Sequence, residues 1–265
     1  MKLSICMMFN NEARYIREWI EFHRMMGVEK FYLYNRLSTD GTVALLQSYI
    51  EQGIVDLKNW PFPGLHSGGR EAYIDSHQDC IDRLKGRVEW LAMVDSDEFL
   101  FSPRCDTVTE ALGIAPEKWG AIGVHWMMFG DSGETEWRDA PVIERFTWRP
   151  LESNYFNRWY KSIVRLDDPD LNTLGSTHRY RTKGGTFNEF GLKLEDNESP
   201  HTSSFLRLNH YFTKSRPEWE TRHPIKQDGV TYERDEKRWF DVQAKDVDDR
   251  TVQRFLPALK ERLQK

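Results

Sequence analysis

The densest group of chemically active side chains is the run Asp95-Ser96-Asp97-Glu98, which directly follows the apolar segment Val88–Val94. Its carboxylates repel one another unless a cation neutralises them. Oxygen ligands at this spacing suit Mg²⁺ or Mn²⁺, and such an ion would in turn hold a pyrophosphate. The alternative is a helix N-terminus, where acidic side chains complement the helix dipole and accept hydrogen bonds from free amides.

Three other side chains could join such a site. Asp40, in the turn-forming stretch Leu37–Thr42, could accept hydrogen bonds from a uracil or ribose, or it could cap the helix that follows. His210 could complete a metal shell begun by Asp97, although a lone histidine is more often structural. Lys214 could face a diphosphate, and its ordinary alternative is a solvated surface lysine.

Cationic and aromatic side chains alternate in the middle of the chain, at Arg145, Trp148, Arg158, Trp159, Tyr160 and Lys161. That mixture could hold an anionic or sugar ligand through charge and stacking. A half-exposed sheet edge has the same pattern, and this is the favoured interpretation for Arg145 and Trp148.

The elements that must position these residues alternate regularly over the first hundred residues. Hydrophobic periodicity and Gly or Pro punctuation predict strands at 3–9, 28–34, 54–60 and 88–94, helices at 12–26, about 42–52 and 70–84, and a loop at 61–69. This order is typical of an α/β fold with a parallel, doubly wound sheet, whose ligands bind at the carboxyl ends of the strands. We therefore expect Asn10–Glu12, Asn35–Asp40 and Asp95–Glu98 to meet at one edge.

The second half is less regular. Its patterns predict strands at 121–129, 160–166, 178–181 and 207–212 and helices at 218–222 and 249–263. No repeat, low-complexity tract or clean linker interrupts the chain, so we predict one domain over residues 1–265.

Composition limits the classes of function. Hydrophobic residues make up 39% and charged residues 30% of the 265 residues, as in folded proteins. A formal charge of −5 without a basic stripe argues against nucleic acid as a partner. Three cysteines without a CxxC pair favour a reducing compartment. No apolar run reaches the ~18 residues of a membrane span, so we predict a cytoplasmic protein, for which peripheral membrane contact stays open.

Several common catalytic motifs are missing from the sequence. It has no Gly-x-Gly-x-x-Gly or Walker-type loop, no Gly-x-Ser-x-Gly elbow and no His-Glu-x-x-His helix. Dinucleotide cofactors, P-loop phosphoryl transfer, serine hydrolysis and zinc proteolysis therefore lack their signatures. A glycosidase would carry its two catalytic carboxylates on separate elements and not together at the end of one strand, so this class of enzyme also finds little support.

An ordered set of short motifs resembles a known family. The motifs are Asn10–Tyr15, Glu18–His23, Gly27–Val28, Phe31–Asn35, Ser38–Thr42, Trp90–Phe99, Phe129–Gly133, Lys161–Arg165, His178 and Asn209–Ser215. Together they span roughly residues 3 to 216 and resemble glycosyltransferase family 92 and the related bacterial family-2-like enzymes. Single motifs are weak signals, whereas the ordered set is specific.

The resemblance implies a GT-A (Rossmann-like) fold with a mostly parallel central sheet flanked by helices. Residues 1–100 would bind the nucleotide-sugar donor and residues 101–265 the carbohydrate acceptor. The donor would be a UDP-sugar, UDP-galactose in the better-known members, with Mn²⁺ or Mg²⁺ as cofactor. The reaction would be an inverting direct displacement that serves polysaccharide or glycoconjugate synthesis.

The resemblance also implies roles for individual residues. Asp95 would contact the ribose or the metal, Asp97 and His210 would ligate the metal, and Asp40 would hold the nucleoside. Asn11 and Glu12 would line the base pocket.

Direct displacement then requires two further groups. Lys161 or Lys214 would stabilise the departing diphosphate, and a carboxylate would take the proton of the acceptor hydroxyl. Asp131, Glu134 and Glu189 are candidates for this base. Asp131 is favoured, although the family motif usually has Ser at this position.

Two other classes of function remain open at this point. A metal-dependent nucleotidyltransferase or sugar-nucleotide phosphohydrolase would share the acidic strand tip and would release different products. A non-catalytic glycan- or nucleotide-binding protein would bind without turnover, and the intact Asp95 and Asp97 argue against it. The donor sugar, the acceptor and the linkage cannot be read from the sequence.

Overall fold

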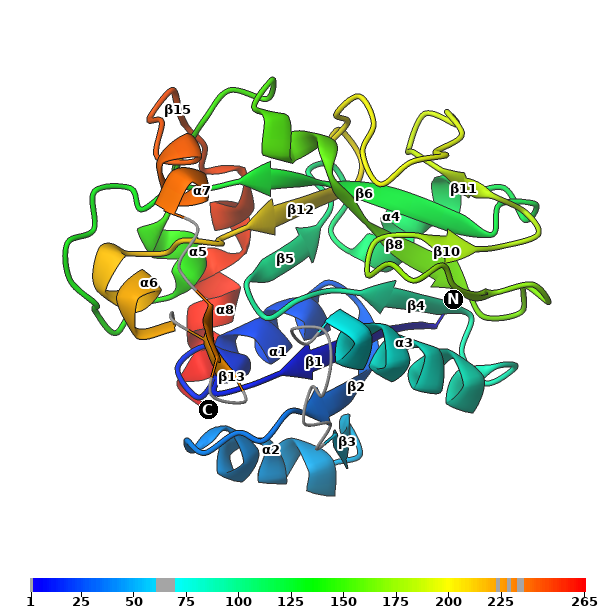
Figure 1. The fold of residues 1–265 in the computed structure, drawn as a ribbon, viewed down its shortest axis with the longest axis horizontal. Coiled ribbons are helices and arrows are strands. Elements are labelled where there is room, and N and C mark those ends of the chain that lie inside the picture. Colours follow the sequence, from blue (N-terminus) through cyan, green and yellow to red (C-terminus); the bar gives the residue numbers. More distant parts are fainter. Residues whose placement is uncertain (1, 61–69, 223–224, 228–229, 233–235) are drawn as a thin grey trace.

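The computed structural model describes residues 2–60, 70–222, 225–227, 230–232 and 236–265 (Figure 1). The loop predicted at 61–69 lies outside the described residues. The α/β class is confirmed, with a mostly parallel, curled central sheet and helices packed against it (Figure 1).

Strands and helices alternate in the first half in the predicted order. They are β1 (Leu3–Phe9), α1 (Ile16–Met25), β2 (Val28–Asn35), α2 (Thr42–Glu51), β3 (Val55–Asn59), α3 (Arg70–Leu84) and β4 (Trp90–Met93). Each predicted element is present, and the bounds differ by a few residues, as expected from periodicity alone.

The second half consists of shorter elements. They are β5 (Glu98–Phe101), α4 (Val108–Ala111), the 3₁₀ helix Leu112–Ile114, β6 (Ala121–Met128), α5 (Val142–Arg145), β7 (Trp148–Arg149), the 3₁₀ helix Tyr155–Arg158, β8 (Tyr160–Arg165), β9 (Asn172–Thr173), β10 (Tyr180–Arg181), β11 (Thr186–Phe187), β12 (Arg207–His210), α6 (Arg216–Arg222), β13 (Ile225–Gln227), β14 (Val230–Tyr232), α7 (Glu236–Asp241), β15 (Val247–Asp248), the 3₁₀ helix Thr251–Phe255 and α8 (Leu256–Leu263).

One alternative interpretation and one prediction need correction here. The acidic run does not begin a helix, because Glu98 is the first residue of β5. The helix predicted at 249–263 is divided into the 3₁₀ turn Thr251–Phe255 and α8.

The central sheet joins both halves of the chain. Its strand order is β3-β2-β1-β4-β8-β6-β12-β5, with β11 added beside β6. The pairs of β1 with β2 and β4, of β2 with β3, and of β6 with β11 and β12 are parallel. Strands β8 and β5 run against their neighbours. As a result, the starts of β8 and β5 lie at the edge where β1, β2 and β4 end.

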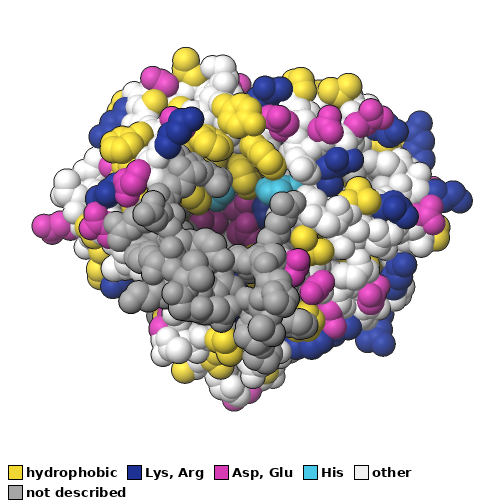
Figure 2. All heavy atoms as spheres, in the orientation of Figure 1, with side chains coloured by type: hydrophobic (Ala, Val, Ile, Leu, Met, Phe, Trp, Pro, Cys, Tyr) yellow, Lys and Arg dark blue, Asp and Glu magenta, His cyan; other side chains and the backbone are white. Residues whose placement is uncertain are grey.

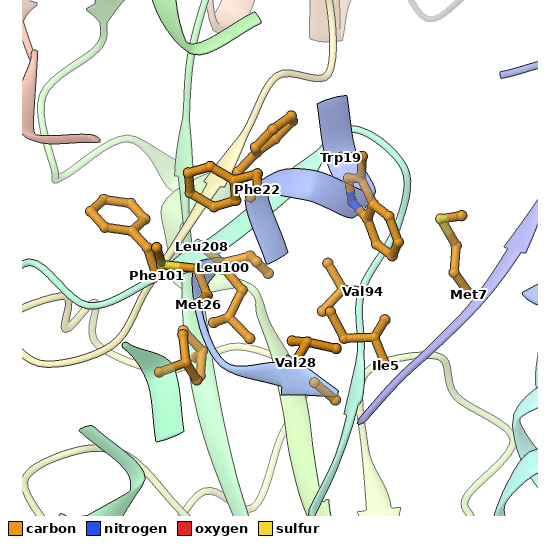
Figure 3. Packing of buried hydrophobic residues seen from close by; sticks show 14 of the residues in the cluster. Ile5, Met7, Trp19, Phe22, Met26, Val28, Val94, Leu100, Phe101 and Leu208 are labelled. Atoms are coloured by element: carbon orange, nitrogen blue, oxygen red, sulfur yellow. The ribbon is translucent and has the colours of Figure 1, made fainter. Parts of the chain in front are cut away.

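Both faces of the first four strands are covered. Ile5 and Met7 of β1 belong to a hydrophobic cluster with Trp19 and Phe22 of α1, as Figure 3 shows. The alternate residues of β1 join a second cluster with Cys80 and Ile81 of α3. Because successive side chains of a strand point to opposite faces, all seven residues of β1 are buried. This explains why its residues are apolar except for Ser4.

Candidate active site

The loops that follow β1 and β2 are joined by hydrogen bonds. The Asn11 side-chain oxygen accepts from the backbone N–H groups of Thr39 and Asp40 at 2.7 and 3.2 Å. Asp40 uses one carboxylate oxygen to accept from the Ala13 N–H at 3.0 Å and the other to accept from the Thr42 N–H at 2.9 Å. The second contact lies at the start of α2, so Asp40 ties the helix start to the β1 loop.

The loop after β4 meets the same edge. Glu12 is buried, and one of its carboxylate oxygens accepts a hydrogen bond from the Ser96 hydroxyl at 2.7 Å. The predicted convergence of 10–12, 35–40 and 95–98 at one edge of the sheet is therefore confirmed. Asn11 has φ = 57°, a left-handed conformation that asparagine tolerates better than most residues.

The acidic turn between β4 and β5 is held by hydrogen bonds from buried tryptophan side chains. Trp19 of α1 donates its indole N–H to the backbone carbonyls of Asp95 and Glu98, at 3.0 and 2.9 Å. Glu98 is fully buried, and its two oxygens accept from the Asp95 N–H at 2.8 Å and from the Trp126 indole N–H at 2.6 Å. Burial raises the pKa of Glu98 well above its usual range.

Lys161 neutralises part of this acidic turn. Ala92 pairs with Ile163 in the antiparallel β4–β8 ladder, so Lys161 lies beside the end of β4. Its ammonium is 2.7 Å from Asp95 and 3.9 Å from Glu98. Burial opposes both charges, but their attraction outweighs it, so the pKa of Asp95 lies below and the pKa of Lys161 above its usual range.

His210 approaches the turn from β12, which lies between β6 and β5 in the sheet. In the antiparallel pairing of β12 with β5, His210 is opposite Glu98. Its Nε2 lies 3.4 Å from the Asp97 carboxylate, and both side chains are buried. The predicted proximity of Asp97 and His210 is therefore present, whereas the nearest charged partner of Asp95 is Lys161.

The described residues contain no group of three or more His, Cys, Asp or Glu side chains close enough to hold a metal ion. The pair Asp97 and His210 nevertheless offers a carboxylate oxygen and an imidazole nitrogen, with the Asp95 carboxylate two residues away in sequence. Carboxylate and imidazole are ligands that Mn²⁺ accepts, so the chemistry of these side chains suits such an ion.

The remaining candidates lie around this centre. Lys214 is buried in a left-handed conformation, φ = 50°, with its ammonium 4.4 Å from the centroid of the Tyr15 ring. It is therefore not the solvated surface lysine of the alternative interpretation.

Asp131 follows β6 by three residues, at the end of that strand where Met128 pairs with His210. One oxygen of its carboxylate accepts from the Gly133 N–H at 2.7 Å, and its backbone N–H donates to the Gln243 side chain.

The two alternative bases are already engaged. Glu134 forms an ion pair with Arg138 at 2.9 Å. Glu189 is buried and accepts from the N–H groups of Ser204, Phe205 and Leu206.

The interpretation of Arg145 as part of a half-exposed sheet edge is wrong. Arg145 ends α5, is buried, and forms a two-point ion pair with Glu218 at 2.9 and 2.6 Å. Tyr160 is also buried, whereas Trp159 is half-buried beside the site.

Sequence reasoning missed three residues at this centre. Glu98 was named only as part of the acidic run, and neither Trp126 nor His178 was assigned a role in the site. The rings of Trp126 and His178 have centroids 5.3 Å apart, and the rings of Trp126 and His210 4.5 Å apart. The apolar run Phe99–Phe101 is the signal that could have predicted β5 and thereby the burial of Glu98.

The space-filling view shows this centre as a hollow. Figure 2 shows the hollow where Figure 1 shows β5, with acidic side chains at its floor, histidines at its sides and hydrophobic side chains above it. The arrangement brings carboxylate, imidazole and ammonium groups together beside an apolar rim.

Comparison with known proteins agrees with this picture. Residues 1–177 match the model of Glycosyltransferase family 92, and the chain therefore belongs to that family. It is 28% identical over 186 residues to a glycosyltransferase family 92 protein of Oryza sativa subsp. japonica and 27% identical over 197 residues to one of Arabidopsis thaliana. These alignments cover 69% of this chain but 30% and 32% of the relatives, so the matched part is about a third of their length.

Two solved structures show weak similarity. S. aureus TarS (residues 1–349) is 15% identical with a TM-score of 0.42, over 84% of this chain and 63% of that chain. Glucosyl-3-phosphoglycerate synthase of Mycobacterium tuberculosis, solved with Mn²⁺, UDP and glucosyl-3-phosphoglycerate, is 17% identical with a TM-score of 0.32, over 47% of this chain and 44% of that chain. Among the described residues of our chain, no helix has the length and apolar character needed to cross a bilayer.

Proposed function

We propose that this chain transfers a sugar from a nucleotide-diphosphate donor, a UDP-sugar such as UDP-galactose, to a carbohydrate acceptor in polysaccharide or glycoconjugate synthesis. Membership of family 92 supports the class of reaction. The observation that carries the proposal is the single edge at which the loops of β1, β2 and β4 meet Lys161 and His210. Residues 1–100 form the donor half and residues 101–265 the acceptor half of this proposal.

The donor binds across this edge. Asn11, Glu12 and Asp40 form the nucleoside side, and Asp95 lies where it can contact the ribose or a cation. Asp97 and His210, with Asp95, would hold Mn²⁺ or Mg²⁺. Such an ion, when bound, neutralises the charge of the diphosphate.

The chain's own cations assist departure of the diphosphate. Lys161 is already within 2.7 Å of Asp95, so an anion at this edge would meet a positioned ammonium group. Lys214 lies against the ring of Tyr15, which directly precedes α1, and would add positive potential at longer range.

Inversion requires one displacement step. The acceptor hydroxyl oxygen forms a bond to the anomeric carbon, and the bond from that carbon to the diphosphate oxygen breaks with its electron pair moving to the diphosphate. The hydroxyl proton passes to Asp131. The contact of Asp131 with Gly133 engages one carboxylate oxygen, and no hydrogen bond to the other is present within the described part of the chain.

Product analysis tests the proposal. Purified protein is incubated with Mn²⁺ and a panel of nucleotide-sugars, and released nucleoside diphosphate and pyrophosphate are measured. We expect nucleoside diphosphate from one donor. Release of pyrophosphate would instead identify a nucleotidyltransferase, release of nucleoside monophosphate a phosphohydrolase, and binding of donor without any product a non-catalytic protein.

A further inference from the structure

Two tryptophans form a stack beside the acidic turn. Trp159 immediately precedes β8, and its backbone carbonyl accepts from the Trp126 N–H of β6 at 2.9 Å. The two rings are 6.3 Å apart between centroids and 25° from parallel. Trp126 is buried and donates its indole N–H to Glu98, whereas Trp159 is half-buried. One ring therefore fixes the position of the other next to the site.

His178 completes the side of this stack. Its ring lies 5.2 Å from Trp159 and 5.3 Å from Trp126 between centroids. Its Nδ1 is 2.8 Å from the Tyr160 carbonyl oxygen, and since a carbonyl only accepts, Nδ1 carries the proton. Nε2 is then a hydrogen-bond acceptor, and it makes no hydrogen bond to any residue that the structure describes. Burial, aided by Lys161, lowers the pKa of His178 to about 3, which keeps this tautomer neutral.

We propose that Trp159 and His178 form a subsite for one pyranose ring of the acceptor, with the ring's apolar face on Trp159 and one of its hydroxyl groups donating to His178 Nε2. The subsite rests on the proposed function, because it names the acceptor's binding place in the same site. An indole offers a flat apolar surface, and a lone acceptor nitrogen beside it selects a ligand with hydroxyl donors.

Position in the sheet assigns the subsite to the acceptor. The nucleoside loops follow β1 and β2, whereas the tryptophans lie on β6 and beside β8. From β1 through β4 to β8, the strand that Trp159 precedes, is two strand spacings, roughly 10 Å. The acidic turn, where the diphosphate is proposed to bind, follows β4 and so lies between β1 and β8 in the strand order. A ring on Trp159 is therefore beyond the diphosphate, on the side opposite the nucleoside.

The test measures glycoside binding separately from nucleotide binding. Saturation-transfer NMR is recorded with methyl β-galactopyranoside, methyl β-glucopyranoside and methyl α-glucopyranoside, in the presence of UDP and the diamagnetic ion Mg²⁺. We expect saturation of at least one glycoside by the wild-type protein and a roughly tenfold weaker affinity in Trp159→Ala. In His178→Asn, whose amide can still donate to Tyr160, we expect roughly fivefold weaker affinity.

Phe190→Ala serves as the matched aromatic control. Phe190 is 64% exposed and lies just after β11, which pairs with Ala121 and Ile122 at the opposite end of β6. This variant should bind the glycosides like the wild type. Thermal melting of all variants checks that they are folded.

Each remaining outcome decides the assignment. If no glycoside binds the wild type, or if Trp159→Ala binds as well as the wild type, the subsite is absent. Calorimetry with UDP and UDP-galactose separates the two sugars of the reaction. If Trp159→Ala loses affinity for UDP-galactose but not for UDP, the subsite holds the donor sugar and the acceptor assignment is overturned. If the wild type binds glycosides but no nucleotide, the proposed function fails while the subsite stands.

Discussion

The two halves of the molecule build their parts of the site in different ways. In the first half, the loops after β1 and β2 are linked through Asn11 and Asp40, which lie 29 residues apart. In the second half, Lys161, Trp126 and His210 come from three strands whose neighbours are set only by long-range pairing. The proposed donor side is therefore held by side-chain hydrogen bonds between two neighbouring loops, and the side with the cations and aromatic rings depends on the pairing of β6, β8 and β12 with their neighbours.

This difference separates two kinds of mutation. Changes at the first half's loops should weaken nucleotide binding without affecting the chemistry. Changes at the acidic turn and the second half should affect turnover or the stability of the whole sheet.

The largest effect is expected at Asp97. Asp97→Asn removes a charge opposite His210 without changing the side chain's size, and nucleoside diphosphate release should fall roughly 10²–10³-fold. Release is measured with the donor that the wild type uses. The exposed Asp170→Asn is the control and should match the wild type. Equal rates for Asp97→Asn and the wild type would remove the acidic turn from the mechanism.

The next effect concerns the proton acceptor. Asp131→Asn can still accept from the Gly133 N–H, so the turn is preserved while the base is lost. Transfer kcat should fall roughly 10²-fold or more, with unchanged affinity for UDP. Glu134→Gln is compared in the same assay. Loss of transfer in Glu134→Gln together with normal transfer in Asp131→Asn would move the base to Glu134.

The stability that the contact between the two halves provides should fall at acidic pH. Glu218 of α6 pairs with the buried Arg145 and accepts from the Tyr15 hydroxyl at the start of α1. Burial alone would raise the pKa of Glu218, but Arg145 and its other partners lower it from 4.5 to about 2. Because the folded pKa is depressed, this stabilisation is present above about pH 5 and is lost as the pH falls toward 2.

Urea unfolding measures this loss. Between pH 5 and pH 2 the wild type should lose about 3 kcal/mol of unfolding free energy through Glu218. Glu218→Gln should be less stable at pH 5 by a similar amount, about 3 kcal/mol, and should lack this part of the acid dependence. Glu51→Gln, on the exposed side of α2, is the control. An unchanged pH profile in Glu218→Gln would show that the ion pair does not couple the halves.

The smallest effect is expected at Asn11. Asn11→Gly keeps the left-handed backbone conformation and removes the acceptor for Thr39 and Asp40. The dissociation constant for UDP, measured by calorimetry, should rise roughly three- to tenfold, with little change in turnover at saturating donor. A large fall in saturated turnover would contradict the assignment of this loop to binding alone.

The same contrast explains what the sequence could predict. The alternation of 3.6-residue and 2-residue periods gave every element of the first half, and a parallel sheet then requires its loops to converge. Asp97 and His210 were predicted together from the ordered motifs. Their neighbours were not, because Glu98 is a charged residue that starts a buried strand and His178 lies in an irregular segment. Arg145 was misinterpreted because its partner Glu218 lies 73 residues away.

Calorimetric titration of UDP into the protein, with Mn²⁺ and then with a chelator, tests the central claim most directly. We expect UDP binding by the wild type that requires Mn²⁺ and that Asp97→Ala abolishes, while Asp170→Asn behaves as the wild type. UDP binding that is unaffected by the chelator and by Asp97→Ala, or no UDP binding in either condition, would contradict the assignment of the acidic turn to a cation-bridged nucleotide-sugar donor.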